Sequence, residues 1–324
     1  MTTDDIDRKM MRRALQLAAA GRGAVAPNPM VGAVITAPDG RIIGQGWHRR
    51  FGGPHAEVNA VASVAEADRD LLRQSTIYVT LEPCSHYGKT PPCARLLAEC
   101  RFARVVVGAG DPNPKVAGRG IAILKDAGIE VTEGVLADQC RSQNREFMFA
   151  HTHHRPWVTL KWAQSSNGFL DGTFSTPLTR QIVHWRRAHS CAIAVGANTV
   201  IADNPSLDTR HIEGNSPQPV ILDRHNLLRD SHARIMANRH TIHVTDKRDI
   251  PALLAWLYAD RSYTSLLVEG GAGVLDSFIA SGTWNEAFVE LSPLKINGKV
   301  SAPSIAIPPS GHSGNIYHYI NPIF

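Results

Sequence analysis

Hydrophobic segments in the first half of this 324-residue chain alternate between short β-branched runs and longer segments with helical spacing. The pattern predicts strands at residues 30–36, 41–46, 76–81, 104–109 and 129–132. It predicts helices at residues 8–21, 54–65, 91–100 and 120–127. Strands that alternate with helices form mainly parallel sheets covered by helices. The first half therefore predicts an α/β domain.

The second half starts the alternation again. It predicts strands at residues 157–163, 191–195, 220–223, 241–244, 266–268 and 287–291, and helices at 179–189, 250–259 and 273–280. Between the halves, residues 143–156 read as a solvated polar linker that includes His151-Thr152-His153-His154. We therefore predict two α/β domains, residues 1–147 and 148–324.

The charged residues argue against a nucleic-acid or membrane partner. The formal net charge is +5, but Lys and Arg are scattered, without a basic run or tail. No stretch approaches the roughly 18 consecutive apolar residues of a transmembrane helix. Residues 10–26 mimic a signal peptide, but Asp4, Asp5 and Asp7 precede them and Arg22 interrupts them. We expect a cytoplasmic enzyme, and the small positive excess suits a phosphorylated small-molecule substrate.

The cysteines point to a metal site. Their number, five, is odd, which without an export signal argues against a disulfide framework. Cys84 and Cys93 have eight residues between them, and His55 precedes both. One His and two Cys are typical zinc ligands, and three protein ligands leave a fourth position open, as in catalytic sites. Cys100 would lie about 10 Å from Cys93 along the expected helix, too far to share the metal.

The expected local structure supports this metal site. His55 opens one predicted helix, and Cys93 opens another, with Thr90 as its cap and prolines in its first turn. The helix dipole there favours the thiolate of Cys93. Cys84 follows a predicted strand end, where the active sites of open α/β sheets gather. Glu57 is the natural proton shuttle for a zinc-activated water, the arrangement of zinc-dependent nucleobase deaminases.

Five motifs of the first half together resemble the bifunctional deaminase–reductase family of riboflavin biosynthesis, the RibD family. They are PNPMVG at 27–32, GPHAE at 53–57, TLEPCSH at 80–86, GKTPPC at 88–93 and DPNPKVAGRG at 111–120. The resemblance implies a cytidine-deaminase-like α/β/α domain that hydrolyses the 2-amino group of a diaminopyrimidinone carrying a phosphoribosylamino group. It implies Zn²⁺ on His55, Cys84 and Cys93, with Glu57 as proton donor. Asn28 and the 111–120 loop would shape the substrate pocket.

The second half lacks a GxGxxG fingerprint, so a Rossmann dinucleotide site is not indicated. Its ordered motifs resemble the reductase domain of the same family: LKWA at 160–163, VGANT at 195–199, DNPSL at 203–207 and VEGGAG at 268–273. The resemblance implies a dihydrofolate-reductase-like α/β fold and NADPH-dependent reduction of the ribosyl group to ribityl. The residues implied to line the NADPH site are Ala163, Thr199, Asp203 and Gly271. The residues implied to face the sugar phosphate are Ser175, Arg187, Leu207, Arg210 and Glu269.

Departures from the family pattern leave alternatives open. Residues 165–168 read SSNG where the family usually has SLDG, Pro177 replaces a Trp, and the segment from 168 to 187 is short. One alternative is therefore a deaminase with an inactive or altered reductase domain. A nucleic-acid deaminase with a C-terminal binding module would need basic stripes with interleaved aromatics, whereas aromatic residues make up only 6% of the chain. A non-catalytic scaffold would need a closed four-ligand metal site. The resemblance also implies a homo-oligomer, a dimer through the reductase domain.

Overall fold

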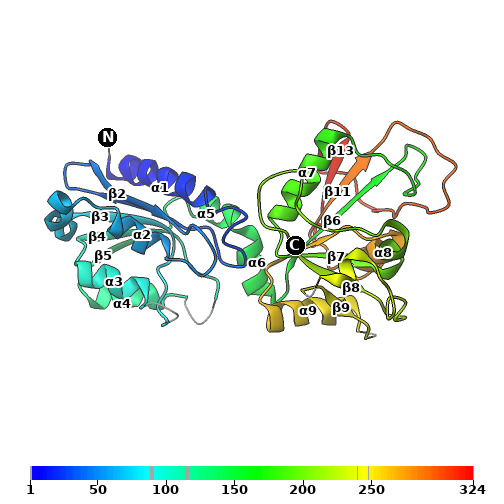
Figure 1. Ribbon diagram of the computed structural model, residues 1–324. Coiled ribbons are helices and arrows are strands. Elements are labelled where there is room, and N and C mark those ends of the chain that lie inside the picture. The colour runs from blue at the N-terminus through cyan, green and yellow to red at the C-terminus, as the bar shows by residue number, and fades with distance from the viewer. Residues whose placement is uncertain (1, 88–90, 114–116, 239, 247, 324) are drawn as a thin grey trace. The chain divides into compact units, whose positions relative to one another are not determined.

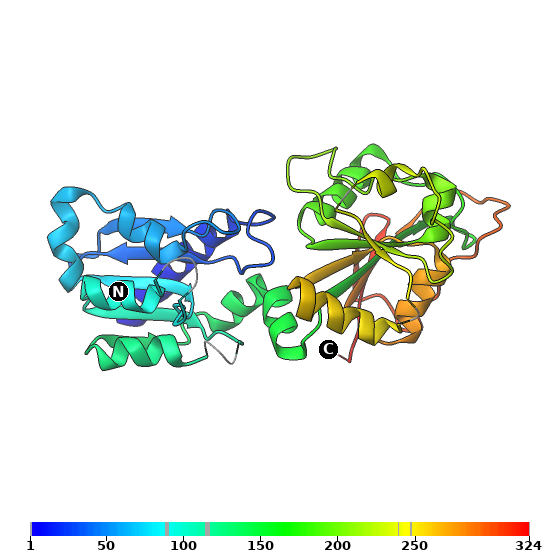
Figure 2. The same cartoon turned by 60° about the horizontal axis from the view of Figure 1, so that its bottom comes forward.

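The computed structural model describes residues 2–87, 91–113, 117–238, 240–246 and 248–323. The chain divides into two compact units, unit 1 (Met1–Thr152) and unit 2 (His153–Phe324), each built on its own β-sheet (Figures 1 and 2). The boundary predicted between residues 147 and 148 falls inside helix α6 (Arg145–His153).

Unit 1 contains a five-stranded sheet in the order β2-β1-β3-β4-β5. The strands are β1 (Gly32–Thr36), β2 (Ile42–Trp47), β3 (Thr76–Leu81), β4 (Arg104–Ala109) and β5 (Glu130–Glu133). Strand β1 is antiparallel to both β2 and β3, whereas β3, β4 and β5 run parallel. The carboxyl ends of β3 and β4 therefore lie together at one edge of the sheet.

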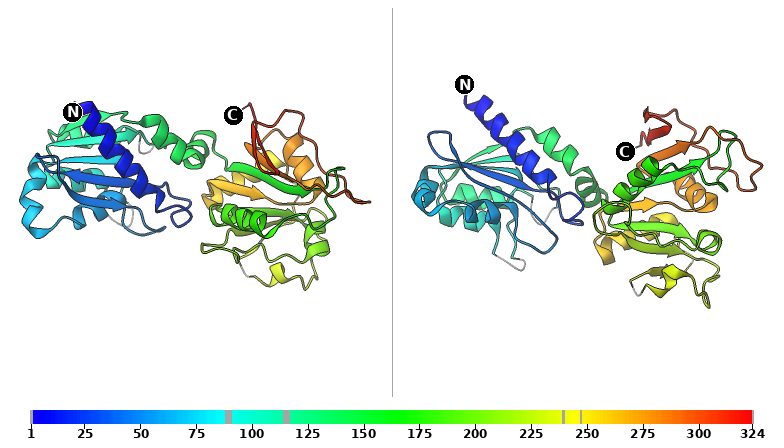
Figure 3. Two further views of the ribbon diagram at one scale, coloured as in Figure 1. Left: turned by 90° about the horizontal axis from the view of Figure 1, so that it is seen from above. Right: turned by 45° about the horizontal axis from the view of Figure 1, so that its top comes forward.

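Helices cover both faces of this sheet, which gives the α/β/α layers expected for the first domain. The helices are α1 (Thr3–Ala19), α2 (Ala56–Ala62), η1 (Glu66–Gln74), α3 (Cys93–Cys100), α4 (Arg119–Asp126), α5 (Ala137–Gln143) and α6. On β3, Tyr78 packs on the face covered by α1 and α5, while Ile77 and Val79 pack on the face covered by α2, α3 and α4. This alternation follows from the two-residue period of a strand. Figure 3 shows α1 crossing its face of the sheet.

Helix α2 lies unusually close to strand β2 because the strand has glycines where the two cross. A Cβ atom added at Gly46 would fall closer than 3.0 Å to the backbone of Ala60 and Ala56, a separation that real Cβ atoms essentially never show. Gly44 makes a similar approach to Ala60 and Val64. The glycines thus set the depth at which α2 sits on the sheet.

The interpretation of residues 143–156 as a polar linker is wrong, because α6 spans most of this segment. Phe147 and Met148 pack against the core cluster that contains Met10 and Cys140. Phe149 is buried as well. These apolar contacts with distant segments stabilise the helix, and they outweigh the polar His-Thr-His-His sequence at its end.

Unit 2 contains an eight-stranded sheet in the order β12-β13-β11-β6-β10-β7-β8-β9. The strands are β6 (Trp157–Gln164), β7 (Ala192–Gly196), β8 (Gln218–Leu222), β9 (Ile242–Val244), β10 (Ser265–Val268), β11 (Glu286–Leu291), β12 (Gly311–Ser313) and β13 (Ile316–Ile320). From β11 to β9 all neighbouring strands are parallel. The antiparallel pair β12 and β13 extends the sheet beyond β11, and the sequence analysis did not predict it.

Helices also cover both faces of the second sheet. They are α7 (Pro177–Ala188), α8 (Ala197–Asp203), η2 (Arg234–Ala237), α9 (Ile250–Arg261) and α10 (Ala272–Ala280). The core on one face joins α9 and α10 to the strands, and the core on the other joins α8 and η2 to them. Helix α7 begins at Pro177 with Thr176 as its N-cap, two residues before the predicted start. Proline suits this first position, where its missing N–H is not needed.

We expect Gly46→Ala to destabilise unit 1 by about 1–3 kcal/mol, because the added methyl group must push α2 away from β2. Thermal unfolding followed by circular dichroism measures the loss. Gly110→Ala is the matched control, since its Cβ would come no closer than 3.9 Å to a neighbouring atom. Equal melting temperatures for the two variants would contradict the close-packing argument.

Candidate functional site

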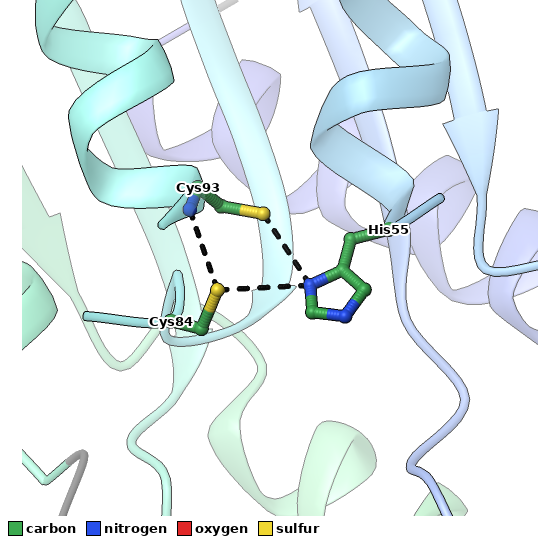
Figure 4. Close-up of side chains that lie close together, drawn as sticks. All are labelled: His55, Cys84 and Cys93. Atoms are coloured by element: carbon green, nitrogen blue, oxygen red, sulfur yellow. Dashed lines mark hydrogen bonds between the residues drawn. The ribbon is translucent and has the colours of Figure 1, made fainter. Parts of the chain in front are cut away.

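The three residues predicted to bind a metal converge in unit 1 (Figure 4). His55 is the N-cap residue of α2, Cys84 follows β3, and Cys93 is the first residue of α3. The Nδ1 atom of His55 lies 3.7 Å from Cys84 Sγ and 3.4 Å from Cys93 Sγ. The backbone N–H of Cys93 donates a hydrogen bond to Cys84 Sγ at 3.3 Å. Thr90, the predicted cap of α3, lies outside the described residues.

The arrangement fits a tetrahedral zinc ion. Zinc bonds of about 2.3 Å to sulfur and 2.0–2.1 Å to nitrogen at tetrahedral angles separate the two ligand atoms by about 3.6 Å. The observed separations, 3.4 and 3.7 Å, agree with this value. Among the described residues, this is the one cluster of three or more such side chains close enough to hold a metal. A fourth coordination position is thus left for water or substrate.

The two thiols share one negative charge before any metal binds. The pKa of Cys84 is lowered to about 4, chiefly by its hydrogen bond with Cys93 and in addition by His55. The pKa of Cys93 is raised, chiefly by its hydrogen bond to Cys84. A thiolate that already faces an imidazole nitrogen is a ready ligand for a soft divalent ion.

Glu57 lies in the first turn of α2, and its side chain reaches the same site. It is only 3% exposed, and burial raises the pKa of its carboxyl to about 7. It also hydrogen-bonds the thiol of Cys93, which places the carboxyl next to the ligand cluster. A carboxyl with a pKa near neutrality both accepts and releases protons readily.

Glu82 is a supporting residue that the sequence analysis did not single out. Its carboxylate, two residues before Cys84, accepts hydrogen bonds from four backbone N–H groups, two in the loop between β4 and α4 and two in the first turn of α4. The donors are the N–H groups of Asp111, Gly118, Gly120 and Ile121, at 3.0–3.4 Å. Gly120 lies so close to the carbonyl of Pro83 that a side chain there would collide with it. Asp111, Gly118 and the start of α4 are therefore held against the segment that carries Cys84.

The predicted substrate residue Asn28 lies close to the metal cluster. Its amide nitrogen is 3.3 Å from Nε2 of His48. The His48 ring is in turn anchored at 3.0 Å to the carbonyl of Pro54 and packs edge-on against His55, 5.4 Å between ring centroids. The predicted 111–120 loop is described except for residues 114–116, which lie outside the described residues. Burial raises the pKa of Asp111 in this loop to about 6.

Unit 2 contains a cavity of about 650 Å³ along the carboxyl ends of four parallel strands. Three of the four predicted NADPH residues, Thr199, Asp203 and Gly271, line it, whereas Ala163 of β6 is not among its lining residues. The backbone N–H of Gly271, the N-cap of α10, donates to Thr199 Oγ1 at 2.9 Å. The cavity wall thus includes the N-terminus of a nine-residue helix, where backbone N–H groups favour an anion.

Two of the predicted substrate residues form a largely buried ion pair with each other, each side chain being 11% exposed. The Nε and Nη2 atoms of Arg187 donate to the two carboxylate oxygens of Glu269 at 3.0 and 2.7 Å, and Nη1 donates to the carbonyl of Asp208. Although burial alone would raise it, the pKa of Glu269 is held below its ordinary value by Arg187. Three of the five guanidinium N–H groups are engaged in this way, which leaves two for a ligand.

The remaining predicted substrate residues are placed differently. Leu207 is buried, with a positive φ of 54°, and it turns the chain between α8 and Arg210. Arg210 is exposed and pairs with Asp208. Ser175 donates a hydrogen bond of 2.6 Å to Glu290 of β11. Most of these polar side chains are therefore already hydrogen-bonded within the protein, and a substrate would have to share or replace those bonds.

Two buried charges in unit 2 were missed by the sequence analysis. Glu290 is 1% exposed, and its second carboxylate oxygen has no hydrogen-bond partner among the described residues. Burial lowers the pKa of Lys161 on β6, while Glu269 and Glu290 oppose the shift. A charged residue inside an apolar strand is the sequence signal that would have indicated both.

Comparison with known proteins identifies both units. Residues 4–109 match the family described as the cytidine and deoxycytidylate deaminase zinc-binding region, and residues 156–307 match the RibD C-terminal domain. Riboflavin biosynthesis protein RibD of Aquifex aeolicus is 36% identical over 91% of this chain and 89% of its own length. RibD of Bacillus amyloliquefaciens is 38% identical, over 91% of this chain and 86% of its own length.

The chain belongs to the RibD family.

Solved structures agree with this assignment. Acinetobacter baumannii RibD superimposes with a TM-score of 0.87 at 31% identity, covering 98% of this chain and 99% of its own. A diaminohydroxyphosphoribosylaminopyrimidine deaminase/5-amino-6-(5-phosphoribosylamino)uracil reductase from Thermotoga maritima superimposes with a TM-score of 0.86 at 35% identity, covering 98% of both chains. These matches confirm the predicted fold class, a cytidine-deaminase-like domain followed by the RibD reductase domain.

The RibD family assignment also confirms the predicted activity. The protein is a bifunctional deaminase and reductase of riboflavin biosynthesis, with a zinc-binding deaminase domain and an NADPH-dependent reductase domain. Pro177, one of the departures from the family pattern, is the first residue of α7, so its role in this chain is to begin a helix.

We expect Glu82→Gln to destabilise unit 1 by about 2 kcal/mol or more, because an amide cannot accept four hydrogen bonds and directs its own NH₂ group at N–H donors. The melting temperature should fall by roughly 5 °C. Glu99→Gln, on the exposed side of α3, is the matched control. If the two variants have the same melting temperature, the hydrogen bonds of Glu82 do not stabilise unit 1.

Proposed function

We propose that unit 1 hydrolyses the 2-amino group of 2,5-diamino-6-(5-phosphoribosylamino)pyrimidin-4-one. The observation that carries this proposal is the convergence of His55, Cys84 and Cys93, with the buried carboxyl of Glu57 beside them. The three side chains would hold zinc. When bound there, zinc makes water a nucleophile near neutral pH.

Glu57 moves the protons of this reaction. Its carboxylate takes a proton from the attacking water as the new C–O bond forms at C2 of the pyrimidine. It then delivers that proton to the departing amino group as the C–N bond breaks, which releases ammonia. Burial supports this role, since the carboxyl is shielded from bulk water and its pKa lies near 7.

The surroundings of this centre favour a pyrimidine with a polar edge. Asn28 and His48 offer an amide and an imidazole beside His55, and the β4–α4 loop held by Glu82 lies against the Cys84 segment. We propose that Asn28 hydrogen-bonds the substrate and that the loop contacts its phosphoribosyl group.

In unit 2 we propose NADPH-dependent reduction of the ribosyl group to give 5-amino-6-(5-phosphoribitylamino)uracil. NADPH supplies the hydride. Thr199, Asp203 and Gly271 line the cavity that would receive it, and the α10 N-terminus suits its pyrophosphate. Ala163 of β6 would contact its nicotinamide end, although it is not among the residues that line the cavity.

For the sugar phosphate of the substrate we propose a site around Arg187 and Glu269. The free N–H groups of Arg187 and the exposed guanidinium of Arg210 suit a phosphate. Glu269 and Ser175 suit sugar hydroxyls, and the positive φ at Leu207 directs the chain toward Arg210. The carboxylate of Glu269 also keeps the arginine oriented.

Two further proposals concern the cellular compartment of the protein and its oligomeric state. The described helices include none that is long and apolar enough to cross a membrane. The five cysteines are free thiols, as is usual in a reducing compartment, and we propose a cytoplasmic enzyme. We also propose the dimer through the reductase domain, which light scattering after size-exclusion chromatography tests directly.

Glu57→Gln should keep its zinc but lose deamination by about 10²–10⁴-fold, since an amide holds no transferable proton. Metal analysis and mass spectrometry of the product measure the two quantities on the same sample. Glu99→Gln serves as control and should retain both. Wild-type turnover by Glu57→Gln would remove Glu57 as the proton shuttle.

The whole proposal is tested by mass spectrometry on protein supplied with the diaminopyrimidinone phosphoribose substrate, zinc and NADPH. We expect an amino-to-oxo mass change followed by the gain of two hydrogens. The first change alone would support the deaminase and overturn the reductase assignment. No change in zinc-loaded protein would overturn the proposed substrate.

A further inference from the structure

Helix α7 holds the chain near Arg210 by two hydrogen bonds, one of which is made by a histidine. His184 and Arg187 are three positions apart on α7, so they lie on the same face of the helix. Nη1 of Arg187 donates to the carbonyl of Asp208 at 3.0 Å. The backbone N–H of Arg210 donates to Nδ1 of His184 at 3.1 Å. The chain from Asp208 to Arg210 is thus fixed to α7 at both of its ends.

These two hydrogen bonds matter because the connection between α8 and β8 has no regular structure of its own. Residues 204–217, all of which the structure describes, form neither a helix nor a strand. Leu207 anchors the start of the connection in the core. The hydrogen bonds of Thr209 go to Ser216 and Asn215, which belong to the same connection. Beyond Leu207, the direction of the chain therefore depends on its bonds to α7.

His184 is suited to its bond because it is buried and uncharged. It is 4% exposed, and its ring lies edge-on to that of His211, with 4.4 Å between the centroids. Burial lowers the pKa of His184 to about 4. The shift is opposed by Glu269 and reinforced by three basic neighbours, Arg187, His211 and Arg210. A neutral imidazole has one nitrogen without a proton, so Nδ1 accepts a hydrogen bond while Nε2 carries the proton.

The side chain of Arg210 needs a fixed backbone because it lies at the surface. It is 54% exposed, and its guanidinium pairs with the carboxylate of Asp208, which is itself 42% exposed. An exposed arginine samples many rotamers, so a ligand that it binds must order it. A backbone that is already fixed removes part of this cost. It also keeps Arg210 next to the face of α7 that carries Arg187, whose guanidinium has two N–H groups left for a ligand.

We infer that His184 is a positioning residue of the reductase, which fixes the backbone of Arg210 so that this arginine and Arg187 bind the phosphate of the substrate together. Two guanidinium groups suit a phosphate, since each offers paired donors to its oxygens. The inference rests on the proposed site of the sugar phosphate and adds a residue that acts on it through Arg210. His184 does not line the cavity proposed for NADPH, so its loss should affect substrate affinity and not cofactor affinity.

Steady-state kinetics of the full-length protein with 5-amino-6-(5-phosphoribosylamino)uracil and saturating NADPH test the inference. His184→Leu keeps the branched shape but has no acceptor in place of Nδ1. It should raise KM by about 3- to 30-fold, the range of a lost hydrogen bond, with kcat within about twofold. His184→Asn places its Oδ1 where Nδ1 was and should restore most of the lost affinity. Calorimetric affinity for NADPH should be unchanged in both variants, which also shows that unit 2 is folded.

His232→Leu is the matched control, because His232 is an exposed histidine of the same unit that does not line the cavity. On an Arg210→Gln background, His184→Leu should add little to KM, since the histidine acts through that arginine. A wild-type KM for His184→Leu would overturn the inference, as would equal losses in His184→Asn and His184→Leu or a full additional loss on the Arg210→Gln background. A wild-type protein that binds NADPH but does not reduce this substrate would overturn the reductase proposal itself, a result distinct from failure at His184 alone.

Discussion

The carboxyl ends of parallel strands meet at one edge of a sheet, so residues that are distant in the sequence become neighbours there. In unit 1 this edge joins Cys84, after β3, to the loop that follows β4. In unit 2 it brings the ends of β10, β7, β8 and β9 along one cavity. Without the parallel arrangement, neither the metal cluster nor the cavity would exist as a continuous site.

Buried carboxylates then hold the edge loops in place. Glu82 and Asp223 have the same function in the two units: each lies just after a strand and accepts backbone N–H groups of a loop or turn. Glu269 fixes a side chain in a similar way, because its ion pair with Arg187 orients the guanidinium. A buried charge is stable only when it is paired or hydrogen-bonded, so the residues that donate to these carboxylates have little freedom to rearrange. Backbone groups that are fixed before binding contact a ligand without an ordering cost.

The sequence predicted most strands of the two sheets, because their apolar runs are local patterns, and it predicted the zinc cluster from the types and order of the residues in its motifs. Strand β3 has the predicted bounds, 76–81, and His55, Cys84 and Cys93 lie together as expected. The other contacts between residues far apart in the chain could not be predicted. The hydrogen bonds of Glu82 span about 30–40 positions, and Arg187 pairs with a residue 82 positions away. Helix α6 was missed for the same reason, since the core against which it packs lies elsewhere in the chain.

The structure also changes how departures from a family motif should be weighed. Pro177 stands where the family usually has a Trp, which from the sequence alone makes an altered reductase domain an alternative. In the fold, Pro177 begins α7 and the hydroxyl of Thr176 accepts a hydrogen bond from the N–H of Thr179 to cap it. The last turns of this helix then present Arg187 to Glu269. A residue that starts the helix therefore helps to fix the position of Arg187, which we propose as a substrate residue, and helix geometry constrains its identity.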